Sequence, residues 1–207
     1  MILRKLCSAA NMAAVLAMFL LAACGTPAKT TYYTLNPVPG NAPPTTTEGQ
    51  AGKAGFSVSV GPVRIPEMVD RPPLVVRQGP NQVEVLEEHR WAESLQPQIA
   101  RTLAADLGSR MGGVRVTASQ DYASQHADYR IPVDIERFDA VPGEAVIIEA
   151  VWTIRGKTEN PRIGCSVIRE PVRSGSYEDI AAGYGRALAA LSDEIAAGLQ
   201  KMRAGGN

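Results

Sequence analysis

The sequence predicts a single α/β domain in which a mixed β-sheet of five to seven strands packs against two long helices. Several segments alternate apolar and polar residues with period two, which is typical of strands. Two longer segments place apolar residues three or four positions apart, which is typical of helices with one buried face. The chain of 207 residues shows no internal repeat and is long enough for one domain with a substantial core.

The first 23 residues have the layout of a secretory signal peptide. Arg4 and Lys5 form a short positive region, an apolar stretch occupies 13–21, and small residues follow at 22–25. The uninterrupted apolar run is shorter than the roughly 20 residues that a helix needs to cross a membrane. We therefore expect the segment 1–23 to be removed.

The residues Leu21-Ala22-Ala23-Cys24 resemble the lipobox of bacterial lipoproteins. This resemblance implies that Cys24 becomes the acylated N-terminus, and a thiolate is the side chain best suited to take up a lipid group. In enterobacterial lipoproteins, Asp directly after the cysteine implies retention at the inner membrane. This chain has Gly25 at that position, which implies export to the outer membrane. Residues 24–30 then form a short lipidated tether. An ordinary signal peptide with an incidental cysteine is the alternative.

Charge and cysteine content narrow the function classes. The chain has 21 basic and 21 acidic residues, and no basic stripe is present, which argues against a nucleic-acid partner. Of three cysteines, one lies in the signal segment and Cys24 is the predicted lipid site. Cys165 therefore has no partner for an internal disulfide, and we expect it to be a small buried residue on a strand. A reactive thiol is the alternative.

The N-terminal part of the predicted domain, which spans 31–205, is rich in strand patterns. Residues 31–35 are aromatic and β-branched and suit an edge strand. A Pro-, Gly- and Thr-rich stretch at 36–55 predicts a flexible loop. A strand begins at Phe56, and the apolar segments 74–77 and 82–87 predict a β-hairpin.

Both predicted helices carry a clear apolar stripe. The first covers about 92–111, and a helix start after Ser94 would put Pro97 in the first turn, where proline is tolerated. An earlier start would make Pro97 a kink. The second helix covers about 177–202, and Ser176 and Asp179 have the spacing of a capping box.

Four further strands are predicted between the two helices. Pro132 indicates that its strand is an edge strand or is bulged. The strand beginning at Ala145 has apolar residues on both faces and should be central and covered on both sides. The predicted strands are 114–118, 129–139, 145–156 and 162–172.

Motifs for catalysis are missing from the sequence. The two histidines, His89 and His126, do not belong to any metal-ligand spacing, and no serine lies in a nucleophile motif. None of the glycines opens a phosphate-binding helix. We expect a protein that is not an enzyme and that needs neither a cofactor nor a metal.

Three segments resemble the ABC-type transport auxiliary lipoproteins, the PqiC (YmbA) family. They are "YYTLNP" after the lipobox, the run 58–108 with "VGPVRIP", "VDRPPLVVR" and "WAESL", and the Ala-rich amphipathic C-terminal helix. The resemblance implies a Rossmann-like domain similar to the N-terminal domain of TolB. The loop at 36–55 is longer than the loop of the family pattern.

The resemblance also implies a function. Members are lipid-anchored on the periplasmic face of the outer membrane and act with an MCE-domain protein, which forms a hydrophobic conduit, and with ABC-type or integral membrane components. The system moves lipid between the two membranes, and the lipoprotein docks the conduit. Alternatives are a pilot lipoprotein of another envelope complex, a lipid-anchored hydrolase and a lipid-carrying shuttle.

A docking surface is expected at the turn 64–73 and the segment 88–91, because Arg and Trp are frequent anchors of interfaces. A packing role for the tryptophan over the start of the first helix is the alternative. Assembly as a homo-oligomer is also open, although no coiled-coil stripe requires it. The candidate docking residues are Arg64, Asp70, Arg71, His89 and Trp91.

Overall fold

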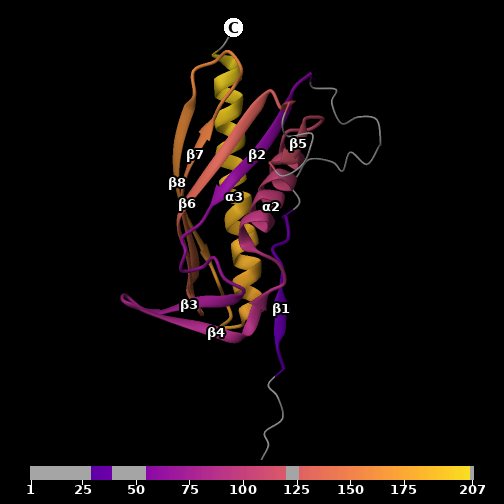
Figure 1. Ribbon diagram of the computed structural model, residues 1–207. Helices are drawn as coiled ribbons and strands as arrows, with labels where there is room; N and C mark the ends of the chain where they lie inside the picture. The colour runs from indigo at the N-terminus through magenta and orange to yellow at the C-terminus, as the bar shows by residue number, and fades with distance from the viewer. Residues whose placement is uncertain (1–28, 39–54, 120–125, 206–207) are drawn as a thin grey trace, which may run out of the picture.

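The computed structural model describes residues 29–38, 55–119 and 126–205. Within them the chain forms two β-sheets and two long helices, so the predicted fold class is confirmed. Figure 1 shows the helices running beside the larger sheet, with the smaller sheet at the end of the molecule opposite the C-terminus. The signal segment 1–23, Cys24 and most of the loop 36–55 lie outside the described residues.

The larger sheet has five strands in the order β5-β2-β6-β7-β8. The first three are parallel to one another, and β7 and β8 continue the sheet in antiparallel pairs. The helix α2 packs on β2 and β5, whereas α3 packs on β7 and β8. The bounds are β2 Ser57–Arg64, β5 Arg115–Ala118, β6 Tyr129–Val141, β7 Ala145–Ile154, β8 Arg162–Pro171, α2 Leu95–Arg110 and α3 Tyr177–Ala204.

The smaller sheet consists of β1 Thr31–Tyr33, β4 Gln82–Trp91 and β3 Pro73–Gly79, in that spatial order. The predicted hairpin is thus confirmed as β3–β4, and β1 is an edge strand that pairs in parallel with β4. The sequence predicts one mixed sheet, whereas these three strands form a separate one. The reason is physical: sheet membership depends on contacts between distant segments, which the local pattern does not encode.

The helix starts agree with the sequence. Helix α2 begins at Leu95 after Ser94, so Pro97 lies in the first turn and causes no kink. Helix α3 begins at Tyr177, and the Ser176 side chain accepts a hydrogen bond from the Asp179 backbone N–H at 3.2 Å. The predicted cap of the second helix is therefore confirmed, whereas Ser94 makes no side-chain capping bond.

Pro132 lies opposite an irregularity in the larger sheet. The strand β6 is paired on both sides, so the edge position is wrong and the bulge is confirmed. The register with β2 shifts between Val60 and Val63, whose partners Ile131 and Val133 flank the proline. Because proline has no N–H to give to a neighbouring strand, the shift removes the need for one.

Two burial expectations on β7 and β8 were wrong. The strand β7 is central, but its second face, including Ile147 and Val151, is only half-buried because the helices cover one face alone. Cys165 is exposed, not buried. It pairs with Val151 on that uncovered face, while its neighbour Ser166 points toward the helices.

Trp152 shows how closely α3 approaches the larger sheet. Its indole fills the space beside Gly164 of β8 and Gly198 of α3, and a Cβ at either glycine would overlap the ring. The indole N–H donates to the Ser166 hydroxyl at 2.9 Å. The core is therefore packed tightly between α3 and the sheet.

Candidate functional site

The segment 31–38, which we call the N-terminal arm, is bound firmly to the domain. Beyond β1, the Leu35 N–H donates to the Gln98 side chain of α2 at 3.0 Å, and Leu35 itself is buried. The backbone oxygen of Asn36 lies against Gly185 of α3, where a Cβ would be only 2.9 Å away. The arm therefore joins both helices and fixes the point at which the chain leaves the domain.

His89 belongs to an aromatic cluster that holds this arm. The Tyr33 hydroxyl lies 2.8 Å from His89 Nδ1, and the His89 ring is 4.2 Å from the ring of Tyr177 at the start of α3. Burial, followed by the nearby Glu178 carboxylate, raises the pKa of Tyr33 above its ordinary value. His89 is half-buried and links the arm to α3.

Trp91 lies in the core and not on the surface predicted for docking. Its side chain is 5% exposed and meets Tyr184 of α3 edge to face at 6.0 Å. Tyr184 in turn stacks on Phe138 at 4.0 Å. Trp91 and Leu95 line the same small apolar cavity, which agrees with the alternative role of packing over the start of α2.

A groove of about 350 Å³ opens just outside Trp91, at the end of the molecule that carries β1. The backbone N–H of Trp91 donates to the Pro72 carbonyl at 2.8 Å and so holds the turn against β4. The Asp70 carboxylate accepts from the Gln96 side chain at 2.7 Å and so ties the turn to α2. We call it the lower groove; its polar and aromatic members are Tyr32, Asp70, Arg71, Arg90, Glu93 and Ser94.

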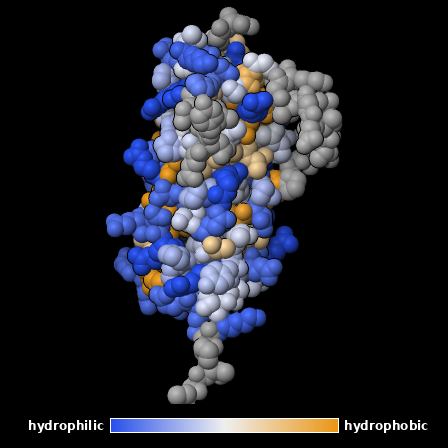
Figure 2. All heavy atoms as spheres, turned by 45° about the vertical axis from the view of Figure 1, so that its right-hand side comes forward, coloured by the Kyte–Doolittle hydropathy of each residue, from blue (hydrophilic) through white to orange (hydrophobic). Residues whose placement is uncertain are grey.

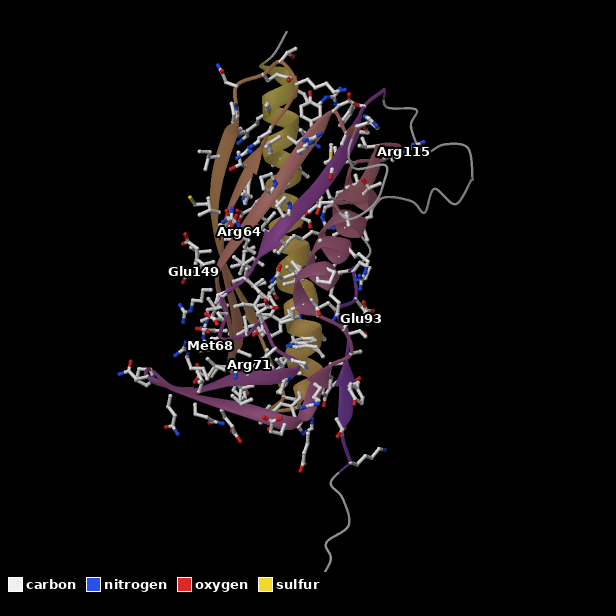
Figure 3. The ribbon with its side chains drawn as sticks, viewed as in Figure 1. Arg64, Met68, Arg71, Glu93, Arg115 and Glu149 are labelled. Carbon is white, nitrogen blue, oxygen red and sulfur yellow. The ribbon has the colours of Figure 1, made fainter. Side chains whose placement is uncertain are left out.

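Arg64 stands apart from this groove. It lies at the end of β2, is 78% exposed and pairs with Asp134 of β6 at 2.9 Å. Figure 3 shows Arg64 beside the larger sheet and Arg71 close to the β3–β4 hairpin. Asp70, Arg71 and Trp91 therefore line one groove, whereas His89 contacts Tyr33 and Tyr177 outside that groove, and Arg64 lies elsewhere.

A charged network that the sequence analysis missed holds the hairpin to the larger sheet. Arg77 of β3 donates to both carboxylate oxygens of Asp139 on β6, at 3.0 and 3.2 Å. Arg137 bonds the same carboxylate at 2.7 Å and also Glu149 of β7 at 3.0 Å. Burial raises the pKa of Asp139, but the bonds from the two arginines outweigh it, and the pKa lies below its ordinary value.

Asp106 is a second missed feature, a buried carboxylate on α2. Burial raises its pKa to about 6, against an opposing effect of Arg110. Arg110 lies 3.7 Å from the Asp106 carboxylate and also pairs with Asp193 of α3. No motif marks this residue, because the sequence shows a single acidic residue on a helix and not the face that it occupies.

The described part of the chain contains no group of three or more His, Cys, Asp or Glu residues placed to hold a metal ion. No helix in that part is both long and apolar enough to cross a membrane. His126 is exposed. The face shown in Figure 2 is mainly hydrophilic, with hydrophobic residues in scattered patches.

The family model for the ABC-type transport auxiliary lipoprotein component matches residues 33–196. The chain belongs to this family. The match begins at the last residue of β1 and ends in α3, so it includes the hairpin and most of the arm and of the lower groove, but not Tyr32. The protein is therefore an auxiliary lipoprotein component of a transport system. Its family is not a known enzyme family.

Solved structures share the fold of this auxiliary lipoprotein. One is the crystal structure of an uncharacterized protein, with 21% identity and a TM-score of 0.66, covering 81% of this chain and 97% of the other. Another is a Xanthomonas campestris protein of the family DUF330, with 19% identity and a TM-score of 0.61, covering 86% and 97%. No curated protein matches the chain.

Proposed function

We propose that this auxiliary lipoprotein is the outer-membrane end of an intermembrane lipid transport system. Cys24 carries the lipid, the domain lies on the periplasmic face of the outer membrane, and an MCE-domain conduit docks on it. ABC-type or integral membrane components complete the system. The observation that supports this most is the bound N-terminal arm, because a rigid exit point converts a lipid anchor into a fixed position for the whole domain.

The length of the tether determines which end of the domain faces the membrane. Residues 24–30 span at most roughly 25 Å when fully extended, at about 3.3–3.6 Å per residue. The start of β1 therefore stays close to the lipid. The hairpin β3–β4 lies at the same end of the molecule (Figure 1), so the lower groove is presented near the membrane surface.

The lower groove is the docking surface in this proposal. Arg71 and Asp70 offer opposite charges beside the exposed ring of Tyr32, a combination that suits a partner with both polar and aromatic contacts. Trp91 supports the groove from beneath, and His89 holds the arm that forms one wall. Arg64 lies outside the lower groove, at the end of β2, and is a separate docking contact in this proposal.

The interior favours an adaptor over a lipid-carrying shuttle. The cavity between the hairpin, α3 and the larger sheet has a volume of about 10 Å³, enough for about one water molecule. Pockets that hold drug-sized ligands have volumes of about 300–1,000 Å³. The packing of Trp152 against Gly164 and Gly198 closes the space between sheet and helix in the same way.

Affinity capture from detergent-solubilised membranes tests the docking role. We expect the tagged protein to retain an MCE-domain protein, and Arg71→Glu to lose it while remaining in the membrane fraction. Arg115→Glu is the matched control, because Arg115 is exposed on β5 and lies outside the lower groove. Retention of a different envelope complex would support a pilot lipoprotein, and equal capture by both variants would contradict docking at this groove.

A further inference from the structure

The strand β8 forms one edge of the larger sheet (Figure 1). It is ten residues long and pairs with β7 through ten consecutive residue pairs without a register shift. In the described part of the chain no strand pairs with its other side, which we call the free edge of β8. At the opposite edge of the sheet, β5 has only four residues and α2 packs on it. The free edge of β8 is therefore the edge on which a further strand can pair.

The hydrogen-bond pattern shows which backbone groups of β8 point to its free edge. The Val172 N–H donates to the Glu144 carbonyl at 2.9 Å, in register with the pairing of β7 and β8. Bonded pairs alternate with non-bonded pairs between antiparallel strands, so the even-numbered residues of β8 bond to β7. The N–H and C=O groups of Ile163, Cys165 and Val167 therefore point away from β7.

The same three residues place their side chains on the uncovered face of the sheet. Ile163 and Val167 are 68% and 74% exposed, more than any other large apolar side chain of the described residues, and Cys165 is also exposed. Edge strands are commonly protected by a bulge, a proline, a lysine or a very short length. The strand β8 has none of these before its last residue, Pro171. Such an edge favours pairing with another strand.

The charges along β8 favour an acidic partner. Arg162, its first residue, is exposed and has no ion pair within the described ranges. Arg169 pairs with Glu144 at 3.7 Å, and both side chains are more than half exposed, so this pair is weak. The one carboxylate of the strand, Glu170, lies 3.7 Å from Arg186 of α3. An acidic side chain beside Arg162 would give it a partner.

We propose that the free edge of β8 binds an extended segment of the conduit partner, which adds a sixth strand to the larger sheet. The inference rests on the docking role proposed above, but it uses a surface outside the lower groove. Main-chain hydrogen bonds to an exposed edge provide affinity, and the alternating side chains provide specificity. We expect the segment to have apolar residues next to Ile163 and Val167 and an acidic residue next to Arg162.

A second copy of this chain fits the free edge less well. Pairing of β8 with β8 across a two-fold axis is antiparallel. Because β8 runs along the length of the molecule (Figure 1), such pairing would put the two N-terminal arms at opposite ends of the dimer. Each tether reaches roughly 25 Å at most. One membrane would therefore not hold both copies by the same end.

Affinity capture of the MCE-domain protein by the full lipidated protein tests this inference. Val167→Pro removes an N–H that points to the partner and is not used in pairing with β7, so its melting temperature should stay near that of wild type. We expect it to capture the partner about tenfold less well, because a partner carbonyl is left unpaired. Val167→Ile keeps both the N–H and the apolar side chain and should capture it as wild type does.

Arg162→Glu is a second variant that leaves the backbone of β8 intact. It should also weaken capture, because it places a carboxylate beside the acidic residue of the partner. Arg115→Glu, which changes an exposed arginine on β5, is its control and should have no effect.

Amide hydrogen exchange in the captured wild-type complex identifies the surface directly. Exchange should become slower at Ile163, Cys165 and Val167 than in the protein alone. It should stay unchanged at Ser166, whose backbone already bonds to β7. Equal exchange at all four residues with and without the partner would overturn the inference.

The capture results distinguish this inference from the proposed function. Full capture by Val167→Pro and Arg162→Glu would overturn the inference, and loss of capture by Arg71→Glu alone would leave docking at the lower groove in place. Absence of the MCE-domain protein from wild-type capture would contradict the proposed function and this inference with it. Dimers of isolated wild type that Val167→Pro abolishes would assign the edge to a second copy and overturn the partner proposed here.

Discussion

Asn36 and Gly185 are in contact across the N-terminal arm and helix α3. Any other residue at position 185 would place its Cβ only 2.9 Å from the Asn36 carbonyl oxygen, which is closer than an ordinary van der Waals contact. Glycine inside a helix costs about 1 kcal/mol relative to alanine. Its presence here is explained by the arm, which could not lie so close to α3 over a larger residue.

Gly185→Ala should therefore release or displace the arm. We expect a lower free energy of unfolding in urea, despite the better helix propensity of alanine, and faster proteolytic cleavage within 31–38. Gly175→Ala is the control, because a Cβ there meets nothing within 4 Å, and its effect should stay within about 0.5 kcal/mol. A Gly185→Ala protein that is more stable than wild type and equally resistant to protease would contradict this role of the arm.

Asp106 should make the protein less stable as the pH rises. Its pKa is raised by burial from 3.8 to about 6 in the folded state, so the folded state binds the proton more tightly than the unfolded state. Stability is then highest below the unfolded pKa and falls between about pH 4 and pH 6. Asp106→Asn should remove this loss and raise the free energy of unfolding by roughly 1–2 kcal/mol at pH 8.

Urea denaturation at pH 4 and pH 8 measures this effect. Arg110 keeps an ion-pair partner in Asp106→Asn, because it also pairs with Asp193. Asp193→Asn, which removes an exposed carboxylate from the same group, is the control and should not show the gain at pH 8. A gain from Asp106→Asn that is equal at both pH values would show that titration of Asp106 is not its cause.

Arg77→Gln should loosen the hairpin from the larger sheet. It removes two hydrogen bonds to the buried Asp139 carboxylate, and the expected loss is about 1–3 kcal/mol. Since Arg137 still bonds Asp139, the charge is not left without a partner. Amide hydrogen exchange should become faster in β3 and β4, whereas Arg101→Gln, which breaks an exposed pair with Glu93, should change neither stability nor exchange. Unchanged exchange in β3 and β4 of Arg77→Gln would contradict the role of the network.

Substitutions of Trp91 and Tyr32 should distinguish effects on folding from effects on docking, because Trp91 is buried and Tyr32 is exposed. Trp91→Ala removes a buried indole and is expected to cost about 3–5 kcal/mol, with loss of partner capture as a consequence of unfolding. Tyr32 is 62% exposed, so Tyr32→Ala should leave the melting temperature nearly unchanged while it weakens partner capture. If Tyr32→Ala captured the partner as well as wild type did, the exposed wall of the lower groove would have no part in docking.

The elements of the fold follow from local patterns, as the helix starts after Ser94 and Ser176 show. The exposure of Cys165, in contrast, does not follow from the local pattern. In β8 the apolar residues Ile163 and Val167 share the phase of Cys165, so the pattern indicates that this side is buried. The opposite side faces the helices because Ser166 accepts from the Trp152 indole and contacts Glu194 of α3. These hydrogen bonds join residues that are far apart in the sequence.

Local patterns predict only the part of the candidate site that does not depend on contacts between distant residues. The turn at Asp70 and Arg71 contains prolines and charges, and it is exposed as its composition indicates. His89 and Trp91 lie in a charged stretch that resembles a surface segment. They are covered by Tyr177 and Tyr184, about ninety residues later in the chain, and no local pattern reveals that contact.

The intact mass of the protein recovered from separated inner and outer membranes tests the central claim most directly. The account predicts that the protein fractionates with the outer membrane and begins at residue 24 with added fatty-acid mass. Cys24→Ser should abolish that mass increment. A wild-type protein that is water-soluble and carries no fatty-acid mass would contradict the lipid-anchored docking role.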